Sequence, residues 1–536
     1  MSANAIASRN CLLENDSMTN LSGKIYLRVF VVLAIVLFIQ MSAIARPYTG
    51  HFASYQATVM AAIGRNMVRE NFKDLLRPKT DIMITSSERS LHLNQYPFPA
   101  VLAATGVRIL GGSFEFWGRF QSILFNLLTA FFLGLLTRRL FDAEIAWIAV
   151  VLYLFSPYTL IYGQSFISEP CSLFFFVLSL FLIVRDSAVE LPLPSLLASA
   201  FSLSIALTGR IHLLIFYPLF FISLWTTMKE RRILKILAFS LIALLMPVAW
   251  YGYTYFASLA QENVHTNIFV QIGLSDTSAA ALTDLTFLRH LGFIFIRTIL
   301  TPVLVVFFFW GLLSSKREGK AFWLPIIGCA LGGFVILLAP QKVMDHDFYL
   351  YGMFPFVVMV TACGVKGFFD KFPGARKWHV PAIAVYLAFS FMAFRNPIYK
   401  GLEEEKQEVR IAEKVRPLIG PSDRVIVASS HPAVLLYYLD RPVWNMDLSQ
   451  IGQPLAPYLK NRRFRKFDPE EIDRLETAMK DPVKWLDYYR SKGADYLIVP
   501  DRHELDLLPG FLSHLRANYV LVSGESDEFC LFRLPK

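Results

Sequence analysis

The chain has 536 residues, of which 55% are hydrophobic and only 18% are charged. Its mean hydropathy of +0.45 is too apolar for a water-soluble protein of this length, so a polytopic membrane protein is expected. The formal net charge is +10. Because the basic residues fall between apolar runs, they are better explained as topology signals and contacts with membrane lipids than as a nucleic-acid site, and no nucleic-acid partner is expected.

The cysteines and the N-terminus carry little functional information. Five cysteines are scattered without a CxxC motif or metal-ligand spacing, so neither a disulfide framework nor a zinc site is predicted. The polar stretch 1–24 precedes an apolar run without a small-residue cleavage site. We therefore expect a cytoplasmic N-terminal tail followed by a retained first helix.

Apolar stretches long enough to cross a bilayer recur along most of the chain. About eleven membrane spans are predicted, with the approximate bounds 25–45, 117–137, 143–162, 167–184, 193–209, 211–228, 233–253, 289–313, 321–340, 348–369 and 380–395.

Basic clusters predict the orientation of these spans. With the N-terminus in the cytoplasm, the Lys and Arg clusters all fall on the cytoplasmic side, as is typical of membrane proteins. The stretch 97–110 is short for a span and is predicted to be a juxtamembrane helix in the outer interface. The clusters are Lys24/Arg28, Arg138/Arg139, Arg185, Lys229/Arg231/Arg232/Lys235, Lys316/Arg317/Lys320 and Lys371/Arg376/Lys377.

Three regions follow from this topology. Residues 1–24 form the tail, 25–395 the transmembrane domain with a long first outer loop at 46–116, and 396–536 a small outer-side α/β domain. The last region has no GxGxxG motif and no P-loop, so nucleotide binding is not expected there. Its predicted elements are helices at 403–417, 431–439, 469–491 and 505–517, and strands at 424–428, 495–500, 519–523 and 529–534.

The first outer loop is rich in polar and aromatic residues. His51 opens an amphipathic segment that includes Tyr55 and Arg65, and Tyr96 lies further along the loop. Each of these residues has a plain structural explanation at a membrane interface. Their clustering on one outer face favours a functional role. Arg119, together with Glu115 at the start of the second span, is more simply explained as a structural ion pair.

Two further charged residues lie at the outer ends of spans. Glu169 precedes an apolar helix, where it could stabilise the helix dipole or contact a ligand. Arg210 lies between two apolar runs, where it could extend to the interface or hold a phosphate or carboxylate with two hydrogen bonds. The densest polar cluster between spans, at 341–351, favours a ligand contact surface and includes Lys342, Asp345, His346, Asp347, Tyr349 and Tyr351.

Several segments resemble the GT-C glycosyltransferases, and in particular the bacterial family 39/83-type enzymes related to protein O-mannosyltransferases and the lipid A aminoarabinose transferase. The resemblance covers most of the membrane part. The segments that carry it are HFASYQATVMAAIGRN, QYPFPAVLAATGVRILGGSFEFWGRFQSILFNLL, LTRRLFD, FSPYTLIYGQSFISEP and HDFYLYGMFPFVVMVTA, with HPAVLLYYLDRPVW and GADYLIVP in the C-terminal region.

The resemblance implies an inverting transferase in a bacterial inner membrane with its C-terminal domain in the periplasm. It would move a sugar from a polyprenyl-phosphate donor to an envelope lipid, glycan or protein. Such enzymes carry a carboxylate in the first outer loop as general base, whereas this chain has His51 at the matching position and no Asp or Glu after it before Glu70. His51 or Glu169 would then activate the acceptor.

The resemblance also suggests how the donor is bound. Arg210, Lys342 and His346 are the candidates for binding the donor phosphate. The substrate cavity would be lined by Tyr55, Arg65, Tyr96, Arg119, Asp345 and Tyr349. No cofactor is required by the sequence, although a divalent cation is compatible with the superfamily and the DHD sequence at 345–347 is weak support for a metal.

Two other functions remain open from the sequence. One is a transporter or flippase of lipid-linked sugars, which is disfavoured because no internal repeat is visible and the polar residues gather at one face. The other is a non-catalytic envelope assembly protein of the same fold. The missing first-loop carboxylate gives this second alternative some weight.

Overall fold

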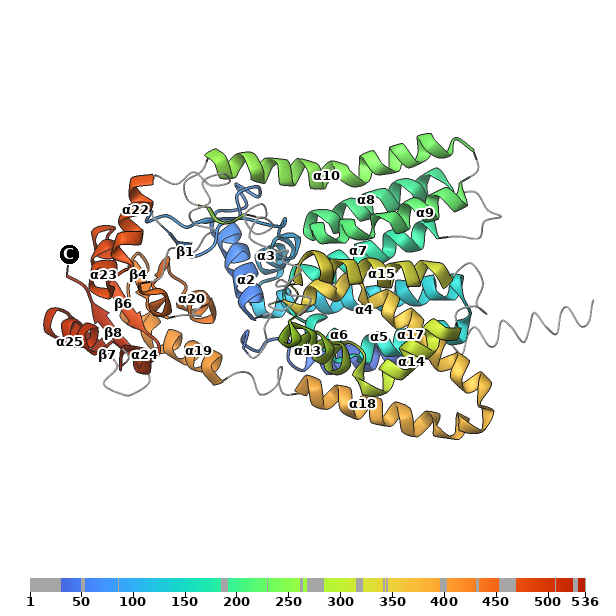
Figure 1. The fold of residues 1–536 in the computed structure, drawn as a ribbon. Helices are drawn as coiled ribbons and strands as arrows, with labels where there is room; N and C mark the ends of the chain where they lie inside the picture. The colour runs from blue at the N-terminus through green and yellow to red at the C-terminus, as the bar shows by residue number, and fades with distance from the viewer. Residues whose placement is uncertain are drawn as a thin grey trace, which may run out of the picture.

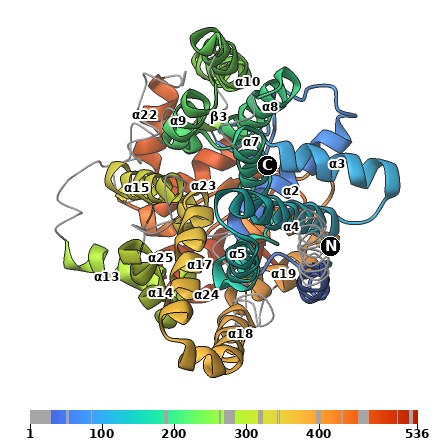
Figure 2. The same ribbon diagram turned by 90° about the vertical axis from the view of Figure 1, so that its right-hand side faces the viewer.

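The molecule has an apolar helical body at one end and a mixed sheet with short helices at the other, as shown in a computed structural model (Figure 1). The helices of the body run roughly parallel to one long axis and are seen nearly end-on in Figure 2. The structure describes residues 30–49, 54–84, 86–184, 191–228, 230–260, 264–267, 284–314, 322–340, 343, 346–395, 403–429, 433–452, 469–506, 508–523 and 529–535.

A helix is found at each of the eleven predicted spans, although most are shorter than predicted. The body begins with the helix Phe30–Met41. It continues with α4 (Phe114–Leu140), α5 (Ala143–Phe155), α6 (Pro157–Tyr162), α7 (Ser168–Ile183), α8 (Leu193–Gly209), η1 (Ile211–Phe216), α9 (Tyr217–Thr227), α10 (Arg232–Ala260), α13 (Leu285–Phe293), η2 (Ile294–Ile299), α14 (Thr301–Ser314), α15 (Trp323–Leu338), η5 (Asp347–Gly352), α17 (Phe354–Lys371) and α18 (His379–Arg395).

The expected number of full-length spans is not reproduced. By length and composition, two helices in the described ranges could cross a membrane, namely Phe114–Leu140 and Arg232–Leu259. A third span results if Leu285–Ile296 and Thr301–Leu313, which are bent by 92°, are counted together. Proline and irregular turns explain part of the difference. The predicted span 143–162, for example, is divided at Ser156, which caps α6 just before Pro157.

Two glycines allow α14 and α17 to pack backbone against backbone. A Cβ atom at Gly364 would lie 1.8 Å from the carbonyl oxygen of Phe307, and one at Gly311 would lie 2.2 Å from that of Val360. Both distances are far shorter than any van der Waals contact. The short distance between the two helices therefore requires glycine at both positions.

Replacing Gly364 by alanine is expected to destabilise the helical body by about 3 kcal/mol, because the two helix backbones must move apart. The measurement is thermal unfolding of the purified protein in detergent. Gly333→Ala in α15 is the matched control, since a Cβ atom there meets no atom within 4 Å. Equal unfolding temperatures of the two variants would contradict the close packing.

The first outer loop is folded between the two ends of the molecule (Figure 1). It contains α2 (Ser54–Arg69), β1 (Ile82–Met83), β2 (Leu91–Leu93) and α3 (Phe98–Leu110). Helix α3 corresponds to the predicted juxtamembrane helix and packs against α2 and α4. Its exposed side chains include Leu102, Ile109 and Leu110. Strand β2 pairs in parallel with β3 (Val264–Asn267).

The C-terminal region forms a six-stranded mixed sheet in the order β1-β5-β4-β6-β8-β7. Strands β1, β5, β4 and β6 are mutually parallel, and β8 runs antiparallel to both of its neighbours, β6 and β7. The strands of this region are β4 (Val425–Val427), β5 (Val443–Asn445), β6 (Tyr496–Val499), β7 (Val520–Ser523) and β8 (Cys530–Arg533), and the helices are α19 (Glu403–Val415), α20 (Ala433–Leu439), α22 (Pro469–Ala478), α23 (Pro482–Ser491), α24 (Arg502–Asp506) and α25 (Pro509–Asn518).

The structure corrects the predicted elements of this region at three places. The helix predicted at 469–491 is two helices, because Asp481 caps α23 and Pro482 occupies its first turn. The helix predicted at 505–517 is likewise divided into α24 and α25. Strand β5 was not predicted, and neither was β1, which the first outer loop adds to the edge of the sheet.

Candidate functional site

A buried ion pair joins the start of α7 to the end of α8. These helices are consecutive and packed side by side, so the start of α7 lies beside the end of α8. Gly209 allows close approach, because a Cβ atom there would lie 2.4 Å from Ser172 Oγ. Glu169, in the first turn of α7, then meets Arg210, which directly follows α8, with Nη2 and Oε1 2.5 Å apart. Each charge also complements the dipole of its own helix.

This ion pair leaves polar atoms unsatisfied. The side chains of Glu169 and Arg210 are only 2% and 8% exposed. Among the residues that the structure describes, none forms a hydrogen bond with Glu169 Oε2 or Arg210 Nε. Buried polar groups are nearly always hydrogen-bonded. A ligand or ordered water with its own polar groups would therefore complete this site.

The first outer loop forms one wall around Arg210. The backbone N–H of Tyr96 donates to the carbonyl of Thr208, and the Tyr96 ring packs edge-on against Trp250 of α10 at 4.9 Å. His92 lies nearby in β2. Burial and the positive charge of Arg210 lower the pKa of His92 to about 4. The imidazole is therefore neutral near pH 7 and does not compete with Arg210 for an anion.

The segment that starts at His346 forms a second wall. The His346 ring stacks on Phe348 at 5.1 Å, and the Phe348 ring lies 5.5 Å from the Arg210 guanidinium carbon. The Tyr349 ring contacts His212 at 5.0 Å. Tyr349 is also close enough to interact electrostatically with both Arg210 and Glu169. Five of the residues singled out from the sequence, Tyr96, Glu169, Arg210, His346 and Tyr349, are thus gathered around one ion pair.

Two tyrosines hold Asp347 beside this cluster. The hydroxyl of Tyr162 donates to Asp347 Oδ1, and that of Tyr158 donates to the Asp347 carbonyl at 2.7 Å. Both tyrosines also lie close enough to Glu169 to interact with it electrostatically. They are four residues apart on α6, so one face of this short helix presents both hydroxyls.

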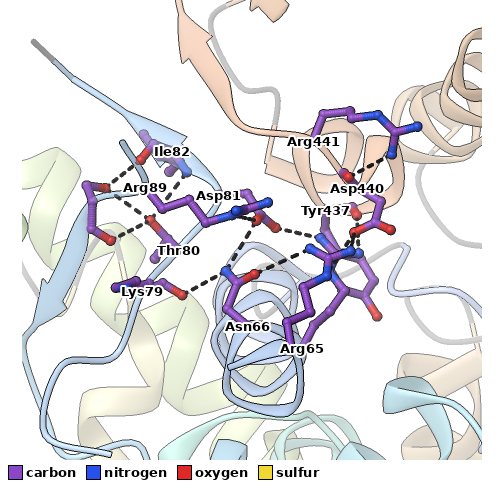
Figure 3. A network of polar contacts seen from close by, with 12 residues as sticks. Arg65, Asn66, Lys79, Thr80, Asp81, Ile82, Arg89, Tyr437, Asp440 and Arg441 are labelled. Atoms are coloured by element: carbon purple, nitrogen blue, oxygen red, sulfur yellow. Dashed lines mark hydrogen bonds and ion pairs between the residues drawn. The ribbon is translucent and has the colours of Figure 1, made fainter. Parts of the chain in front are cut away.

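Arg65 belongs to a different network (Figure 3). Its guanidinium pairs with Asp81 at 2.5 Å and with Asp440 at 2.9 Å, and it donates to the carbonyl of Tyr437. Arg89 also pairs with Asp81, at 2.8 Å. This ion network joins the first outer loop to the C-terminal region and is made of Arg65, Arg69, Asp81, Arg89 and Asp440. The position of Arg65 therefore favours a structural role over the predicted place in a substrate cavity.

Arg119 is also held by the backbone. It donates to the carbonyls of Ile44, Arg46 and Pro47, and its guanidinium carbon lies 4.8 Å from the centre of the Tyr48 ring. It thus fixes the start of the first outer loop, and its predicted pairing with Glu115 is not its main contact. His51, Lys342, Asp345 and the side chain of Tyr55 lie outside the described residues.

Two nearby residues, His92 and Tyr162, were not selected from the sequence. Tyr162 and Asp347 lie within segments that carry the GT-C resemblance. The i, i+4 spacing of Tyr158 and Tyr162 is the sequence signal that both hydroxyls lie on one helix face. Over the described ranges, no group of three His, Cys, Asp or Glu side chains is placed to hold a metal ion.

The fold is GT-C-like, because the chain is similar in structure to solved GT-C glycosyltransferases over 88–95% of its length. The predicted fold is thus confirmed at this level, while the family 39/83 branch stays a prediction. No protein-family model and no curated protein matches the chain by sequence.

Three solved structures illustrate the similarity. ArnT from Cupriavidus metallidurans bound to undecaprenyl phosphate has a TM-score of 0.61 and 13% identity, with 95% of this chain and 97% of that chain covered. The oligosaccharyltransferase of Archaeoglobus fulgidus has a TM-score of 0.52 and 12% identity, with 88% and 69% covered. The arabinofuranosyltransferase AftD from mycobacteria has a TM-score of 0.55 and 13% identity, with 94% and 41% covered.

Proposed function

We propose that the protein is a membrane glycosyltransferase that moves a sugar from a polyprenyl-phosphate donor to a cell-envelope lipid, glycan or protein. It would reside in a bacterial inner membrane, with a cytoplasmic N-terminus and a periplasmic C-terminal domain. The ion pair Glu169–Arg210 would lie at the outer face. The GT-C-like fold supports this proposal, and so does the undecaprenyl phosphate bound by the structurally similar ArnT.

The proposed reaction is a single displacement at the anomeric carbon with inversion. The acceptor hydroxyl oxygen forms a bond to this carbon while the bond to the phosphate oxygen breaks. The hydroxyl proton passes to a base, for which His51 and Glu169 are the candidates, and the polyprenyl phosphate leaves as an anion. No metal ion is required for this step, because the departing phosphate needs stabilisation of negative charge, which arginine can supply.

The proposal rests on the buried position and the hydrogen-bonding state of Arg210. Its guanidinium is buried beside aromatic rings, is oriented by Glu169, and has an Nε atom without a hydrogen-bond acceptor in the described part of the chain. Charge-assisted bonds from a planar guanidinium to phosphate are strong and directional. Lys342 and His346 are proposed as further phosphate contacts.

The proposal is tested in cells that produce the wild-type protein or the variants His51→Ala, Glu169→Gln and Arg210→Ala. We expect envelope glycolipids or glycoproteins of wild-type cells to carry a mass increase of one sugar, and each variant to lose it although the protein remains in the membrane. Mass spectrometry of the envelope fractions is the measurement. Full modification in all three variants would refute the site.

A second experiment, with the purified protein in liposomes, separates the other two functions. A flippase of lipid-linked sugars would move the donor across liposome membranes without releasing free polyprenyl phosphate. A non-catalytic assembly protein would bind undecaprenyl phosphate but leave the sugar–phosphate bond intact. Release of polyprenyl phosphate that depends on the acceptor is therefore the result that favours the transferase over both.

A further inference from the structure

Helices α9 and α10 meet at the end of the molecule opposite the C-terminal sheet (Figure 1). A shallow groove lies at this junction. Its volume is about 740 Å³, and it is lined by Trp225, Arg231, Arg232, Ile233, Leu234 and Leu237. The groove includes two arginines of the basic cluster at 229–235, which the sequence alone explains as a topology signal and a general contact with membrane lipids. It is separate from the Arg210 site, which lies at the other end of α8 and α9.

One part of the groove is cationic and is held in place. The guanidinium carbon of Arg232 lies 4.7 Å from the centre of the Trp225 ring, and its Nε donates to the carbonyl of Met228 at 2.7 Å. These two contacts fix the plane of the guanidinium. Arg231 is exposed beside it. The groove thus presents two positive charges, and its six lining residues include no carboxylate.

The other part of the groove is apolar and open. Ile233, Leu234 and Leu237 are 68%, 62% and 60% exposed. They continue into the exposed apolar face of α10, where Leu241, Leu245 and Val248 are also exposed. Since α10 is long and apolar enough to cross a membrane, this face is suited to contact with acyl chains.

We propose that this groove is a binding site for an anionic phospholipid. Arg231 and Arg232 would hold the headgroup phosphate, and Trp225 would cover it from the side. The acyl chains would follow the apolar residues along α10. A free phosphate ion would use the arginines alone and leave half of the groove exposed to water. The charge complementarity therefore selects a lipid with net negative charge over a zwitterionic lipid.

The test measures lipid binding to the full-length purified protein by native mass spectrometry, with phosphatidylglycerol and phosphatidylcholine as probes. Phosphatidylglycerol is expected to bind more tightly to the wild type. The variant Arg231→Gln/Arg232→Gln should weaken its binding roughly 25-fold, about fivefold for each charge removed, and leave phosphatidylcholine binding unchanged. Lys371→Gln/Lys377→Gln removes the same charge on the same predicted side of the membrane and should not change either affinity.

A second variant tests the groove with both arginines retained. Leu237→Glu places a carboxylate among the apolar lining residues and should also weaken phosphatidylglycerol binding, whereas the exposed Leu313→Glu in α14 should not. The proposal is overturned if phosphatidylcholine binds as tightly as phosphatidylglycerol, if inorganic phosphate competes with the lipid at equal concentration, or if neither groove variant differs from its control. Because no sugar transfer is measured, the outcome is independent of the proposed enzymatic function.

Discussion

Replacing Arg210 by alanine is expected to lower the rate of sugar transfer by roughly 100- to 1,000-fold, the effect typical of removing one group that stabilises negative charge in a transition state. Both KM for the donor and kcat should change, since the guanidinium would bind the donor phosphate before and during the reaction. The measurement is the steady-state rate with purified protein and a polyprenyl-phosphate-linked sugar.

Two variants separate catalysis from folding at this position. Arg210→Ala leaves Glu169 buried without its partner, which by itself destabilises a protein by about 3–5 kcal/mol. Glu169→Gln/Arg210→Gln removes both charges together and should restore much of this stability without restoring transfer. Arg108→Ala, which removes an exposed arginine from α3, is the control with full activity. Full transfer by a folded Arg210→Ala variant would show that the donor phosphate is bound elsewhere.

Replacing Asp81 by asparagine is expected to destabilise the outer part of the molecule by about 3 kcal/mol or more. Asp81 is 2% exposed and lies between Arg65 and Arg89, so its removal deprives the partly buried Arg89 of this counter-ion and leaves Arg65 to pair with Asp440 (Figure 3). The apparent unfolding temperature should fall by roughly 5–10 °C. Asp74→Asn is the matched control, because the pair of Asp74 with Arg77 is exposed and contributes about 1 kcal/mol or less.

The same carboxylate predicts a dependence of stability on pH. Burial alone would raise the pKa of Asp81, but Arg65 and Arg89 outweigh it and hold the pKa below the ordinary value of 3.8. The stabilisation is therefore complete above about pH 4 and is lost as the pH falls through the lowered pKa. We expect the difference in stability between wild type and Asp81→Asn to be constant from pH 5 to 7 and to shrink below pH 4. A difference that grows on acidification would contradict the ion pairs.

The helices of the body could be predicted from the sequence, because long apolar runs are a local signal. Their lengths could not, because breaks such as the one at Ser156 and Pro157 depend on a cap and a proline within an otherwise apolar run. Strand β1 has only two residues and gains its partner Val443 from the opposite end of the chain. No local pattern distinguishes such a strand from a loop.

The candidate site, like the fold, could be predicted from the sequence only in part. The antiparallel order of two consecutive spans made the meeting of Glu169 and Arg210 accessible to sequence reasoning. The place of Arg65 was not accessible, since its amphipathic helix gives no information about Asp440, with which it pairs across the molecule. Charged residues in a long loop can bind a ligand or form ion pairs with another part of the chain. Only the folded structure distinguishes these two roles.

The edge strand β1 has a consequence for the order of biosynthesis. The first outer loop emerges early, whereas the Tyr437 carbonyl that accepts from Arg65 lies 372 residues later. A growing chain therefore holds an unfinished loop until most of the polypeptide has been translated. We expect a ribosome-released fragment that ends before β5 to expose residues 74–90 to protease, and the completed chain to protect them.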